Sequence, residues 1–393
     1  MMAEQAARLI AFYLPQYHPI PENDEWWGKG FTEWTNVMNA KPQYRGHDQP
    51  NQPSELGYYD LRSPEIREQQ AQLAKEHGIE GFCYWHYWFN GKLLLERPVL
   101  DMLASGRPDI PFCLAWANEP WSRRWTGEPL DILQEQTYGG VEDHERHFEW
   151  LLPALTDRRA IKVDGKPLFL IYRADQVPDI RGMLARWRVL AASNGLPGLY
   201  FISIGTTGTY GIDTRAWGFD AVLEFQPNWK KCGEFMKWGD PRIGNRFRNL
   251  LRAVSESEGR IVTRIDPSGI MRKSLKRLQG PRIFDYKELW PYLFNGGEPS
   301  YPSYPCVFPR WDNSPRKGRR GLIVKDSDPY EYRKWLTSAI GKVASRPRDC
   351  RLVFINAWNE WAEGNYLEPD RKFGRAYLEA TRDAISSKAA ERI

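Results

Sequence analysis

Two glutamates lie three residues apart near the end of the chain, in the stretch I-N-A-W-N-E-W-A-E-G-N-Y-L-E-P-D at residues 355–370. Making or breaking a glycosidic bond needs one group that protonates the departing oxygen and another that acts as base, nucleophile or charge stabiliser. Paired carboxylates supply both functions once their pKa values are pushed apart. We therefore predict that Glu360 and Glu363 are the catalytic pair of a carbohydrate-processing site.

Indole and amide side chains surround this pair. An indole ring offers a flat apolar surface that matches the C–H face of a sugar, and an asparagine amide can exchange hydrogen bonds with its hydroxyls. We expect Trp358 and Asn359 to contact a sugar in this way. The alternative is a solvated loop with packed tryptophans, because E-x-x-E spacing is common on helix surfaces. The apolar run at residues 352–355, which is typical of a buried strand, favours the site.

Seven further apolar runs precede this one, and helical patterns separate most of them. The eight predicted strands are residues 9–14, 81–89, 112–117, 168–172, 199–204, 221–225, 306–308 and 352–355. The predicted helices are residues 65–77, 93–103, 141–155, 180–192, 330–343 and 374–386. Continuous apolar runs are typical of parallel strands that are covered on both faces. Eight strand and helix units predict an α/β protein with a (β/α)8 barrel fold.

A doubly wound open sheet is the alternative fold. The first apolar run is not followed by G-x-G-x-x-G, which argues against a dinucleotide-binding version of that sheet. Residues 229–290 interrupt the strand and helix rhythm with a basic stretch, and we predict a loop insertion there. The whole chain, residues 1–393, is then expected to form a single catalytic barrel domain.

Polar and aromatic residues gather where the predicted strands end. In barrels of this type the carboxyl ends of the strands carry the active site. Several carboxylates with Trp and Asn neighbours favour a sugar-binding face over packing alone, although His86 by itself is more typical of a core histidine. In addition to Trp358 and Asn359, the residues expected to bind substrate are Trp34, Tyr84, His86, Trp116, Asn118, Glu119, Trp121, Glu224 and Asp312.

Composition narrows the choice of partner. The chain has 18 Trp, 19 Tyr and 17 Phe, often in short clusters, which favours a stacking surface for a glycan. A net charge of +5, from 55 basic and 50 acidic residues, argues against nucleic acid as a partner. The basic run at residues 310–320 is interpreted as a solvated loop, with contact to a phosphate-bearing substrate or a membrane surface as the open alternative.

No metal or other cofactor is expected. The six histidines show no H-x-x-x-H spacing. The acidic tripeptide Asp326-Ser327-Asp328 matches the D-x-D of many nucleotide-sugar transferases, but it precedes Pro329 and a predicted helix, which favours a helix cap. Five cysteines without a C-x-x-C pair, the lack of a basic and apolar leader, and the lack of an apolar run of roughly 18 residues predict a cytoplasmic protein without a transmembrane segment.

Three long motifs resemble one family. They are A-F-Y-L-P-Q-Y-H-P-I-P-E-N-D-E-W-W-G-K-G-F-T-E-W-T-N-V from residue 11, G-F-C-Y-W-H-Y-W-F-N-G-K from residue 81 and W-A-N-E-P-W-S-R-R-W from residue 116. Together with the closing stretch they closely resemble the WbsX-type family over nearly the whole chain. The resemblance implies a role in a bacterial polysaccharide or O-antigen (lipopolysaccharide) locus, where members are often labelled glycosyltransferases.

The closing stretch is also similar to glycoside hydrolase family 99, the endo-α-mannosidases, whose loop has the form N-E-W-x-E-G followed by a later Glu. This resemblance implies a (β/α)8 barrel and a retaining mechanism through a 1,2-anhydro sugar. On the matching positions Glu360 would assist the substrate 2-hydroxyl, and Glu363 would be the general acid/base. Ala362 stands where the mannosidases usually have His, which leaves the choice between mannose-like and rhamnose-like sugars open.

Three functional hypotheses follow. The first is a retaining glycoside hydrolase that acts on α-linked, mannose- or rhamnose-like bacterial polysaccharide. The second is a glycosyltransferase of O-antigen or capsular polysaccharide biosynthesis. The third is a non-catalytic glycan-binding module, which the aromatic residues alone would favour.

Overall fold

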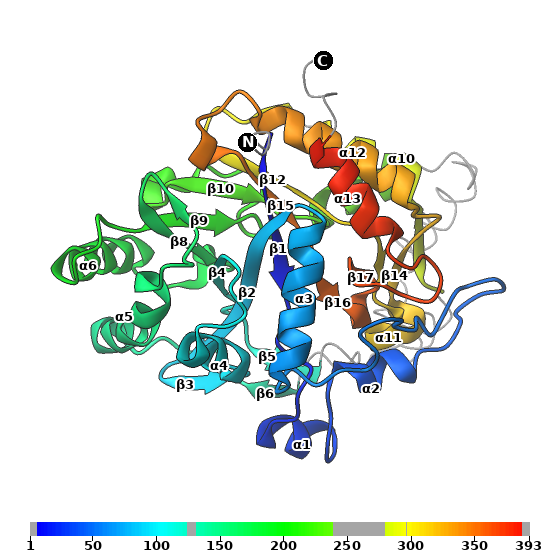
Figure 1. The fold of residues 1–393 in the computed structure, drawn as a ribbon, viewed down its shortest axis with the longest axis horizontal. Coiled ribbons are helices and arrows are strands. Elements are labelled where there is room, and N and C mark those ends of the chain that lie inside the picture. The colour runs from blue at the N-terminus through cyan, green and yellow to red at the C-terminus, as the bar shows by residue number, and fades with distance from the viewer. Residues whose placement is uncertain (1–5, 124–130, 239–279, 296, 387–393) are drawn as a thin grey trace, which may run out of the picture.

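Eight parallel strands form a closed barrel at the centre of the computed structural model, which describes residues 6–123, 131–238, 280–295 and 297–386. These strands are β1 (Arg8–Tyr13), β2 (Ile79–Phe89), β4 (Phe112–Trp116), β8 (Lys166–Ile171), β9 (Tyr200–Ile204), β10 (Ala221–Glu224), β12 (Ser303–Val307) and β15 (Leu352–Ile355). Strand β1 pairs with both β2 and β15, so the sheet closes on itself (Figure 1). The predicted (β/α)8 barrel is confirmed, and the open sheet is excluded.

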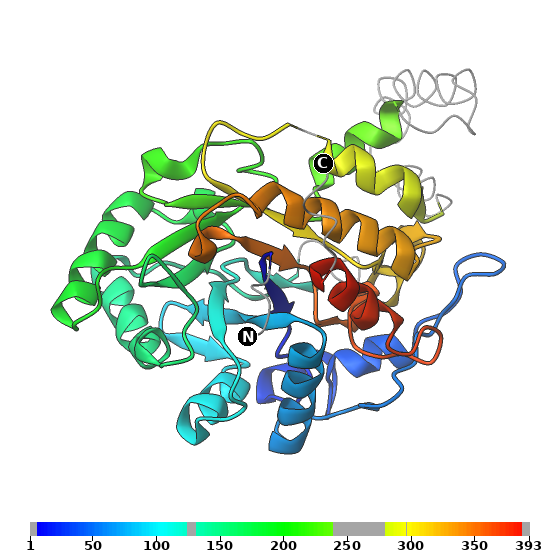
Figure 2. The ribbon, with the colours of Figure 1, turned by 45° about the horizontal axis from the view of Figure 1, so that its top comes forward.

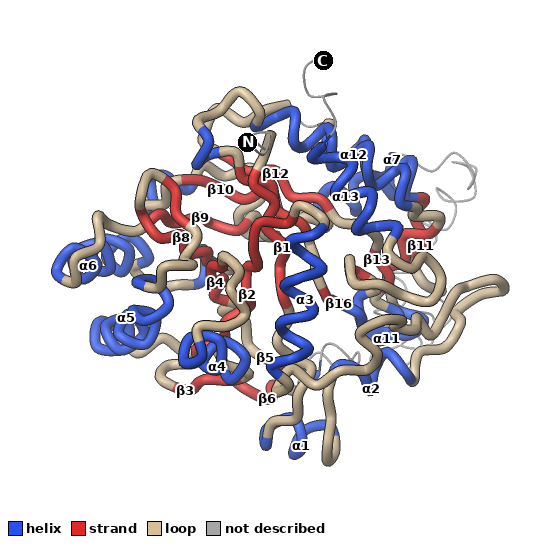
Figure 3. The backbone as a smooth tube through the Cα atoms, viewed as in Figure 1, coloured by secondary structure: helices blue, strands red, loops and turns tan. Residues whose placement is uncertain are grey.

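Helices surround the barrel wall, as Figures 2 and 3 show. The longer ones are α3 (Pro64–Glu76), α4 (Arg97–Ser105), α5 (Gly140–Thr156), α6 (Ile180–Ser193), α7 (Trp229–Trp238), α10 (Tyr286–Phe294), α12 (Pro329–Val343) and α13 (Ala376–Ser386). One predicted helix is partly wrong: residues 92–94 instead form β3 (Lys92–Leu94), an antiparallel partner of β2, and the helix begins only at Arg97 with Pro98 in its first turn. Pro is favoured at that position because N–H groups in the first turn of a helix have no partner within the helix, so a residue without an N–H loses no hydrogen bond there.

Short helices and strands follow several of the barrel strands at their carboxyl ends. After β1 come α1 (Pro21–Trp27) and α2 (Glu33–Met38); after β4 come β5 (Trp121–Ser122) and β6 (Ile132–Gln134); after β12 come β13 (Trp311–Asp312), α11 (Ser314–Lys317) and β14 (Leu322–Lys325); after β15 come β16 (Asn359–Glu360), η6 (Trp361–Glu363) and β17 (Asn365–Tyr366). The other short elements are β7 (Lys162–Val163), β11 (Arg282–Asp285), η2 (Ala174–Gln176), η3 (Thr214–Trp217), η4 (Gly318–Arg320) and η5 (Arg348–Cys350).

Local sequence signals account for several helix starts. The Ser63 hydroxyl accepts a hydrogen bond from the Ile66 N–H at the start of α3. A carboxylate oxygen of Asp328 accepts from the Tyr330 and Glu331 N–H groups, at 2.8 and 3.0 Å, at the start of α12. Such side-chain caps satisfy N–H groups that a helix leaves without partners. The cap interpretation of the acidic tripeptide is therefore correct for Asp328.

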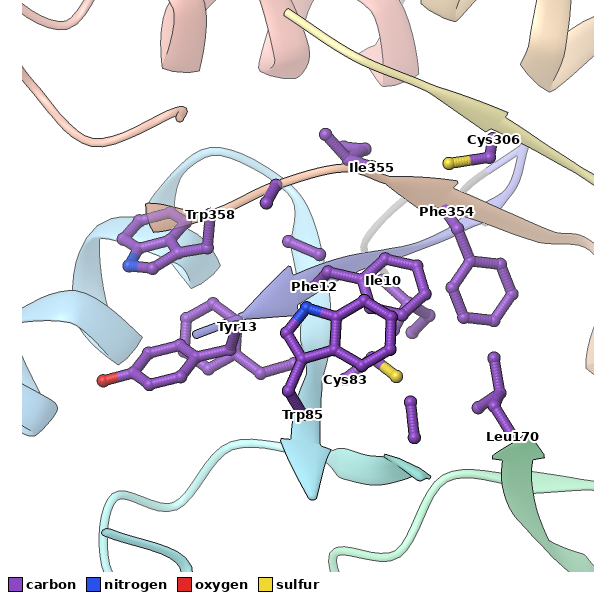
Figure 4. Packing of buried hydrophobic residues seen from close by; sticks show 14 of the residues in the cluster. Ile10, Phe12, Tyr13, Cys83, Trp85, Leu170, Cys306, Phe354, Ile355 and Trp358 are labelled. Atoms are coloured by element: carbon purple, nitrogen blue, oxygen red, sulfur yellow. The ribbon is translucent and has the colours of Figure 1, made fainter. Parts of the chain in front are cut away.

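Large side chains fill the barrel interior. The Phe12 ring stacks on Trp85 with 4.7 Å between centroids, and Phe354 packs beside them (Figure 4). Neighbouring residues on the same strands point the other way, because side chains alternate along a strand. The Tyr13 hydroxyl, for example, donates a hydrogen bond to Gln70 of α3, outside the barrel.

The predicted insertion includes α7, β11 and α10 at its two ends. Its middle, residues 239–279, lies outside the described residues, and so does Trp125 in the loop after β4. Strand β11 pairs in parallel with β14, which ties the second half of the insertion to the loop that follows β12. None of the helices in the described segments is long and apolar enough to cross a membrane.

Candidate active site at the carboxyl ends of the barrel strands

Three carboxylates contact one buried guanidinium at this end of the barrel. The Nη2, Nη1 and Nε atoms of Arg316 lie 3.2 Å from Glu360 Oε2, 2.8 Å from Glu363 Oε1 and 3.1 Å from Glu33 Oε2. The side chains of Arg316 and Glu33 are only 4% and 1% exposed, whereas that of Glu363 is 22% exposed. We call these four residues the carboxylate–arginine cluster. It brings the two predicted catalytic glutamates together. Glu363 is the member of the cluster that is most open to solvent.

The backbone around Glu360 is held by buried hydrogen bonds to the loop after β1. Asn359 Oδ1 accepts from the Leu14 N–H at 2.7 Å, and Asn359 Nδ2 donates to the Leu14 carbonyl at 3.0 Å. The Tyr17 hydroxyl donates to the Asn359 carbonyl and accepts from the Trp361 N–H. Asn359 therefore positions Glu360 and has no amide left to bind a sugar.

A close approach between Gly364 and Asp312 places Glu363. Gly364 has φ of +57°, and a Cβ there would lie 2.9 Å from both the Cβ and the backbone nitrogen of Asp312. Asp312 in turn accepts hydrogen bonds from Gln49 Nε2 and from the Ser314 N–H, which begins α11, and its Oδ2 lies 2.8 Å from His47 Nε2. Asp312 thus holds the helix that carries Arg316. Its carboxylate oxygens already have hydrogen-bond partners within the protein, so they need no bound sugar.

The third glutamate of the closing stretch, Glu368, is buried. It accepts hydrogen bonds from Trp361 Nε1 at 2.6 Å, Tyr59 OH at 2.9 Å and Gln70 Nε2 at 2.7 Å. Burial raises the pKa of Glu368 to about 7. Because these partners come from α3 and from the loops after β1 and β15, Glu368 is a structural link between three elements.

Burial also controls the charge of the cluster. It raises the pKa of Glu360 to about 8; Arg316 opposes this rise, and the negative charges of Glu363 and Glu33 add to it. Burial disfavours the charged guanidinium of Arg316, but the three carboxylates outweigh that effect and raise its pKa. A carboxyl whose pKa lies close to neutral can both hold and release a proton under ordinary conditions, as acid–base catalysis requires.

A small cleft of about 30 Å³ opens beside the cluster. It is lined by Gln16, Trp27, Glu33, Asn36, Trp121, Ser122, Leu133 and Arg316. Gln16 is 4% exposed, and its Oε1 atom has no hydrogen-bond partner within the described part of the chain. The Tyr87 ring packs edge-on against Trp121, with 5.1 Å between centroids. Indole rings beside free acceptors suit a ligand with apolar faces and many hydroxyls.

Three predicted binding residues lie on the outer face of the barrel instead. Tyr84 packs against Tyr13, and Trp116 packs against His147 of α5. His86 stacks on Trp150 of α5 at 4.5 Å, and its Nε2 lies 2.8 Å from that of His147. Side chains alternate along a strand, so the inward residues at this end of β2 are Trp85 and Tyr87. The expectation that Tyr84, His86 and Trp116 bind substrate is therefore corrected.

Two predicted tryptophans are packing residues. Trp34 is 4% exposed, its ring packs on Tyr17 and Trp361, and its Nε1 donates to the Tyr59 carbonyl. Trp358 is fully buried against Phe82. Neither indole lines the cleft, so the expectation that they contact sugar is corrected.

The two polar residues after β4 differ in their surroundings. Asn118 is fully buried: its Nδ2 donates to the Arg173 carbonyl and its Oδ1 accepts from the Arg173 N–H, so its amide links two strand-end loops. Glu119 is 44% exposed and pairs with the Arg173 guanidinium at 2.5 Å. Asn118 is thus a structural residue, whereas Glu119 remains open to solvent at the same end of the barrel.

Glu224 points away from the cluster, into a separate cavity of about 460 Å³ on the outer side of β10 and β12. Lys231 and Lys342 also line that cavity. Burial raises the pKa of Glu224, although the two lysines oppose the rise. The next residue, Phe225, packs on Phe12 in the barrel interior, so the outward direction of Glu224 follows from alternation along the strand. Its predicted place in the site is wrong.

Two members of the cluster escaped sequence reasoning. Glu33 directly precedes Trp34, and the aromatic ring of Trp34 is the feature that predicted substrate binding at this position. Arg316 lies in the basic run at residues 310–320, and the interpretation of that run as a solvated loop is wrong for Arg310 and Arg316, which are both buried. Arg310 pairs with Asp370 and lies 3.9 Å over the Tyr366 ring. The signal available was the position of the run, which begins just after the predicted strand at residues 306–308 and contains the Trp311-Asp312 pair.

Fold and site together define a (β/α)8-barrel protein with a carboxylate-rich site at the carboxyl ends of its strands. In the described ranges, no three His, Cys, Asp or Glu residues are grouped to hold a metal ion. The fold is similar to that of the GH99 endo-α-mannosidase from Bacteroides thetaiotaomicron, with a TM-score of 0.56, 14% identity, and coverage of 98% of this chain and 99% of that one. A glycoside hydrolase-like protein gives a TM-score of 0.56 at 13% identity, covering 98% and 96%.

The chain belongs to the family described as glycosyltransferase WbsX, whose model matches residues 9–381. Two relatives from Xanthomonas campestris pv. campestris, strains B100 and ATCC 33913, are both described as uncharacterized protein WxcX. Each is 40% identical over 381 residues, which cover 97% of this chain and 50% of the relative. The chain therefore spans about half the length of these curated relatives.

Proposed function

We propose that the protein is a retaining glycoside hydrolase that acts on α-linked, mannose- or rhamnose-like bacterial polysaccharide. The observation that carries this proposal is the placement of Glu360 and Glu363 on the two Nη atoms of one buried arginine, at the end of the barrel where such enzymes carry their site. Two carboxyl groups in unlike surroundings, one buried and one partly exposed, suit the two roles that glycoside hydrolysis requires.

Glu360 is proposed to assist the substrate 2-hydroxyl. Its pKa of about 8 makes its carboxylate a stronger base than an ordinary glutamate, and a general base works best when its pKa lies near the pH of the reaction. The carboxylate takes the hydroxyl proton, and the freed oxygen displaces the leaving group to give a 1,2-anhydro sugar. Glu363, at the more exposed edge of the cluster, protonates the departing oxygen.

Water then opens the anhydro sugar. Glu363, now ionised, takes a proton from the water, and Glu360 returns its proton to the 2-oxygen, so both groups regain their starting states. Two inversions at the anomeric carbon give net retention. The small cleft beside Glu33 is proposed to contact one hydroxyl of a neighbouring sugar through the free Gln16 oxygen, with Trp27 and Trp121 beside it.

The test is turnover of a panel of oligosaccharides with α-mannosyl and α-rhamnosyl linkages, with the anomer of the product followed by NMR. We expect Glu360→Gln and Glu363→Gln each to lower turnover by about 10²- to 10⁴-fold without loss of fold. Glu80→Gln is the matched control, because Glu80 pairs with Arg8 at the opposite end of the barrel strands. Near-wild-type turnover in both site variants would refute the proposal.

The alternative is a glycosyltransferase of O-antigen or capsular polysaccharide biosynthesis, which the description of the family favours. That function requires a sugar donor. Binding and turnover of nucleotide-linked or lipid-linked sugars, with no hydrolysis of the oligosaccharide panel, would establish it. A non-catalytic glycan-binding module is the third candidate, and it is rejected if an oligosaccharide is cleaved and Glu363→Gln abolishes the cleavage.

A further inference from the structure

Three loops that are far apart in sequence meet at the carboxylate–arginine cluster. Glu33 comes from α2 after β1, Arg316 from α11 after β12, and Glu360 with Glu363 from the loop after β15. Each of the three guanidinium nitrogens of Arg316 contacts a different carboxylate. A planar guanidinium has a fixed fork geometry, so these contacts set the spacing of the carboxylates as well as their charge.

The balance of charge in this cluster is uneven. The charged groups that act on Glu360 are Arg316, Glu363 and Glu33, and they come from α11, η6 and α2. The other titratable side chains around it are the phenols of Tyr87, on β2, and Tyr17, in the loop after β1. Among the described residues, one cation therefore faces three carboxylates, and removal of Arg316 or of Glu33 moves the protonation of Glu360 in opposite directions.

We propose that Arg316 and Glu33 are positioning residues of the reaction. Arg316 holds Glu360 and Glu363 at their working separation, and Glu33 holds the guanidinium from its remaining side, at Nε. This inference rests on the proposed function, since it assigns roles toward Glu360 and Glu363. It extends the site to a third loop and a third carboxylate.

Opposite shifts in pH dependence follow. Arg316→Met removes the cation that favours ionised Glu360, so the pKa of Glu360 rises and the acid limb of the rate profile moves to higher pH. Glu33→Gln removes a neighbouring negative charge, so the same limb moves to lower pH. A charge within about 4–6 Å changes a pKa by roughly one unit or more, which sets the size expected for each shift. Arg316→Lys keeps the charge without the fork, so kcat should fall while the limb moves less than in Arg316→Met.

The experiment measures kcat/KM against pH for wild-type enzyme and these three variants, with whichever α-mannosyl or α-rhamnosyl oligosaccharide the wild-type protein cleaves. A second readout does not depend on activity: glutamate labelled with ¹³C at the carboxyl carbon gives the titration of Glu360 by NMR, assigned by the signal lost in Glu360→Gln. Glu80→Gln serves as the control for removal of a paired carboxylate elsewhere. Circular dichroism and thermal unfolding verify the fold of each variant.

The inference is supported if the acid limb of the rate profile and the NMR titration move in opposite directions in Arg316→Met and Glu33→Gln. Both should stay in place in Glu80→Gln. Unmoved titrations in folded variants would overturn the inference. If Glu360→Gln and Glu363→Gln are inactive in that case, the hydrolase proposal still holds without roles for Arg316 and Glu33. Active Glu360→Gln and Glu363→Gln enzymes would instead refute the hydrolase. If Arg316→Met does not fold, Glu33→Gln decides the question, because it is nearly isosteric.

Discussion

Asn359 holds the backbone of Leu14 from both sides, through its Oδ1 on the Leu14 N–H and its Nδ2 on the Leu14 carbonyl. This pair of hydrogen bonds joins the end of the first barrel strand to the loop after the last one, one residue before Glu360. The closing stretch, which has the composition of a sugar-binding loop, is therefore mostly a clamp. Its Asn359, Trp361 and buried Glu368 hold the loop, and Glu360 and Glu363 are the pair proposed for catalysis.

Removal of the Asn359 amide should lower both stability and activity. Asn359→Ala leaves the Leu14 N–H and carbonyl buried without partners, and each such group costs about 1–3 kcal/mol. We expect a lower free energy of unfolding in urea and, because Glu360 loses its anchor, a lower kcat/KM. Asn194→Ala is the control, since that amide bonds the Leu190 carbonyl at an exposed helix end. Equal effects of the two substitutions would contradict the anchoring role.

The contact of Gly364 with Asp312 can be separated from backbone strain. Gly364 and Gly374 have nearly the same φ, +57° and +53°, but a Cβ at Gly374 meets nothing within 4 Å. Gly374→Ala should therefore report only the strain of the left-handed region, about 1 kcal/mol or more. Gly364→Ala should cost more than that, and it should also lower activity by displacing Glu363. Urea unfolding and kcat/KM of both variants give the difference.

Buried carboxyl groups should make the protein less stable as pH rises. The pKa of Glu368 is raised from 4.5 to about 7, so between these values the folded state keeps a proton that the unfolded state has lost. This stabilisation is complete below pH 4.5 and is lost as pH rises through 7, with a slope of at most about 1.4 kcal/mol per pH unit for one proton. Glu360 acts in the same direction up to about pH 8.

The measurement is the free energy of unfolding in urea at several pH values from 5 to 8. Glu368→Gln cannot lose a proton, so its curve should be flatter than that of the wild-type protein between pH 5 and 7, whatever its absolute stability. An unchanged slope would show that Glu368 is ionised in the folded state throughout this range.

The two faces of β2 should respond differently to loss of a hydroxyl. Tyr87 faces the cluster, where Glu360 and Arg316 act on its phenol, whereas Tyr84 packs outside the barrel against Tyr13. We expect Tyr87→Phe to lower kcat/KM about tenfold, equivalent to one hydrogen bond of about 1.4 kcal/mol, and Tyr84→Phe to leave it nearly unchanged. The reverse order would place Tyr84 in the site after all.

Much of the fold could be predicted because it depends on local pattern. The eight apolar runs, and the Pro and Asp residues at helix starts, each act through near neighbours in the chain. The position of Glu360 and Glu363 just after the last strand follows from the same pattern together with the polarity of a barrel. Their separate catalytic roles, and the assignment of residues 1–393 to one catalytic domain, stay predictions.

By itself the sequence determined that residues 81–89 form a largely apolar strand, but not which of its faces is inside. Both faces of a parallel barrel strand are buried, so hydrophobicity does not distinguish Tyr84 and His86 from Trp85 and Tyr87. Only the closed barrel made that choice. The tertiary structure likewise decided that Arg316 is buried rather than solvated, because its three carboxylate partners come from distant loops, and a buried charge is stable only where such partners converge.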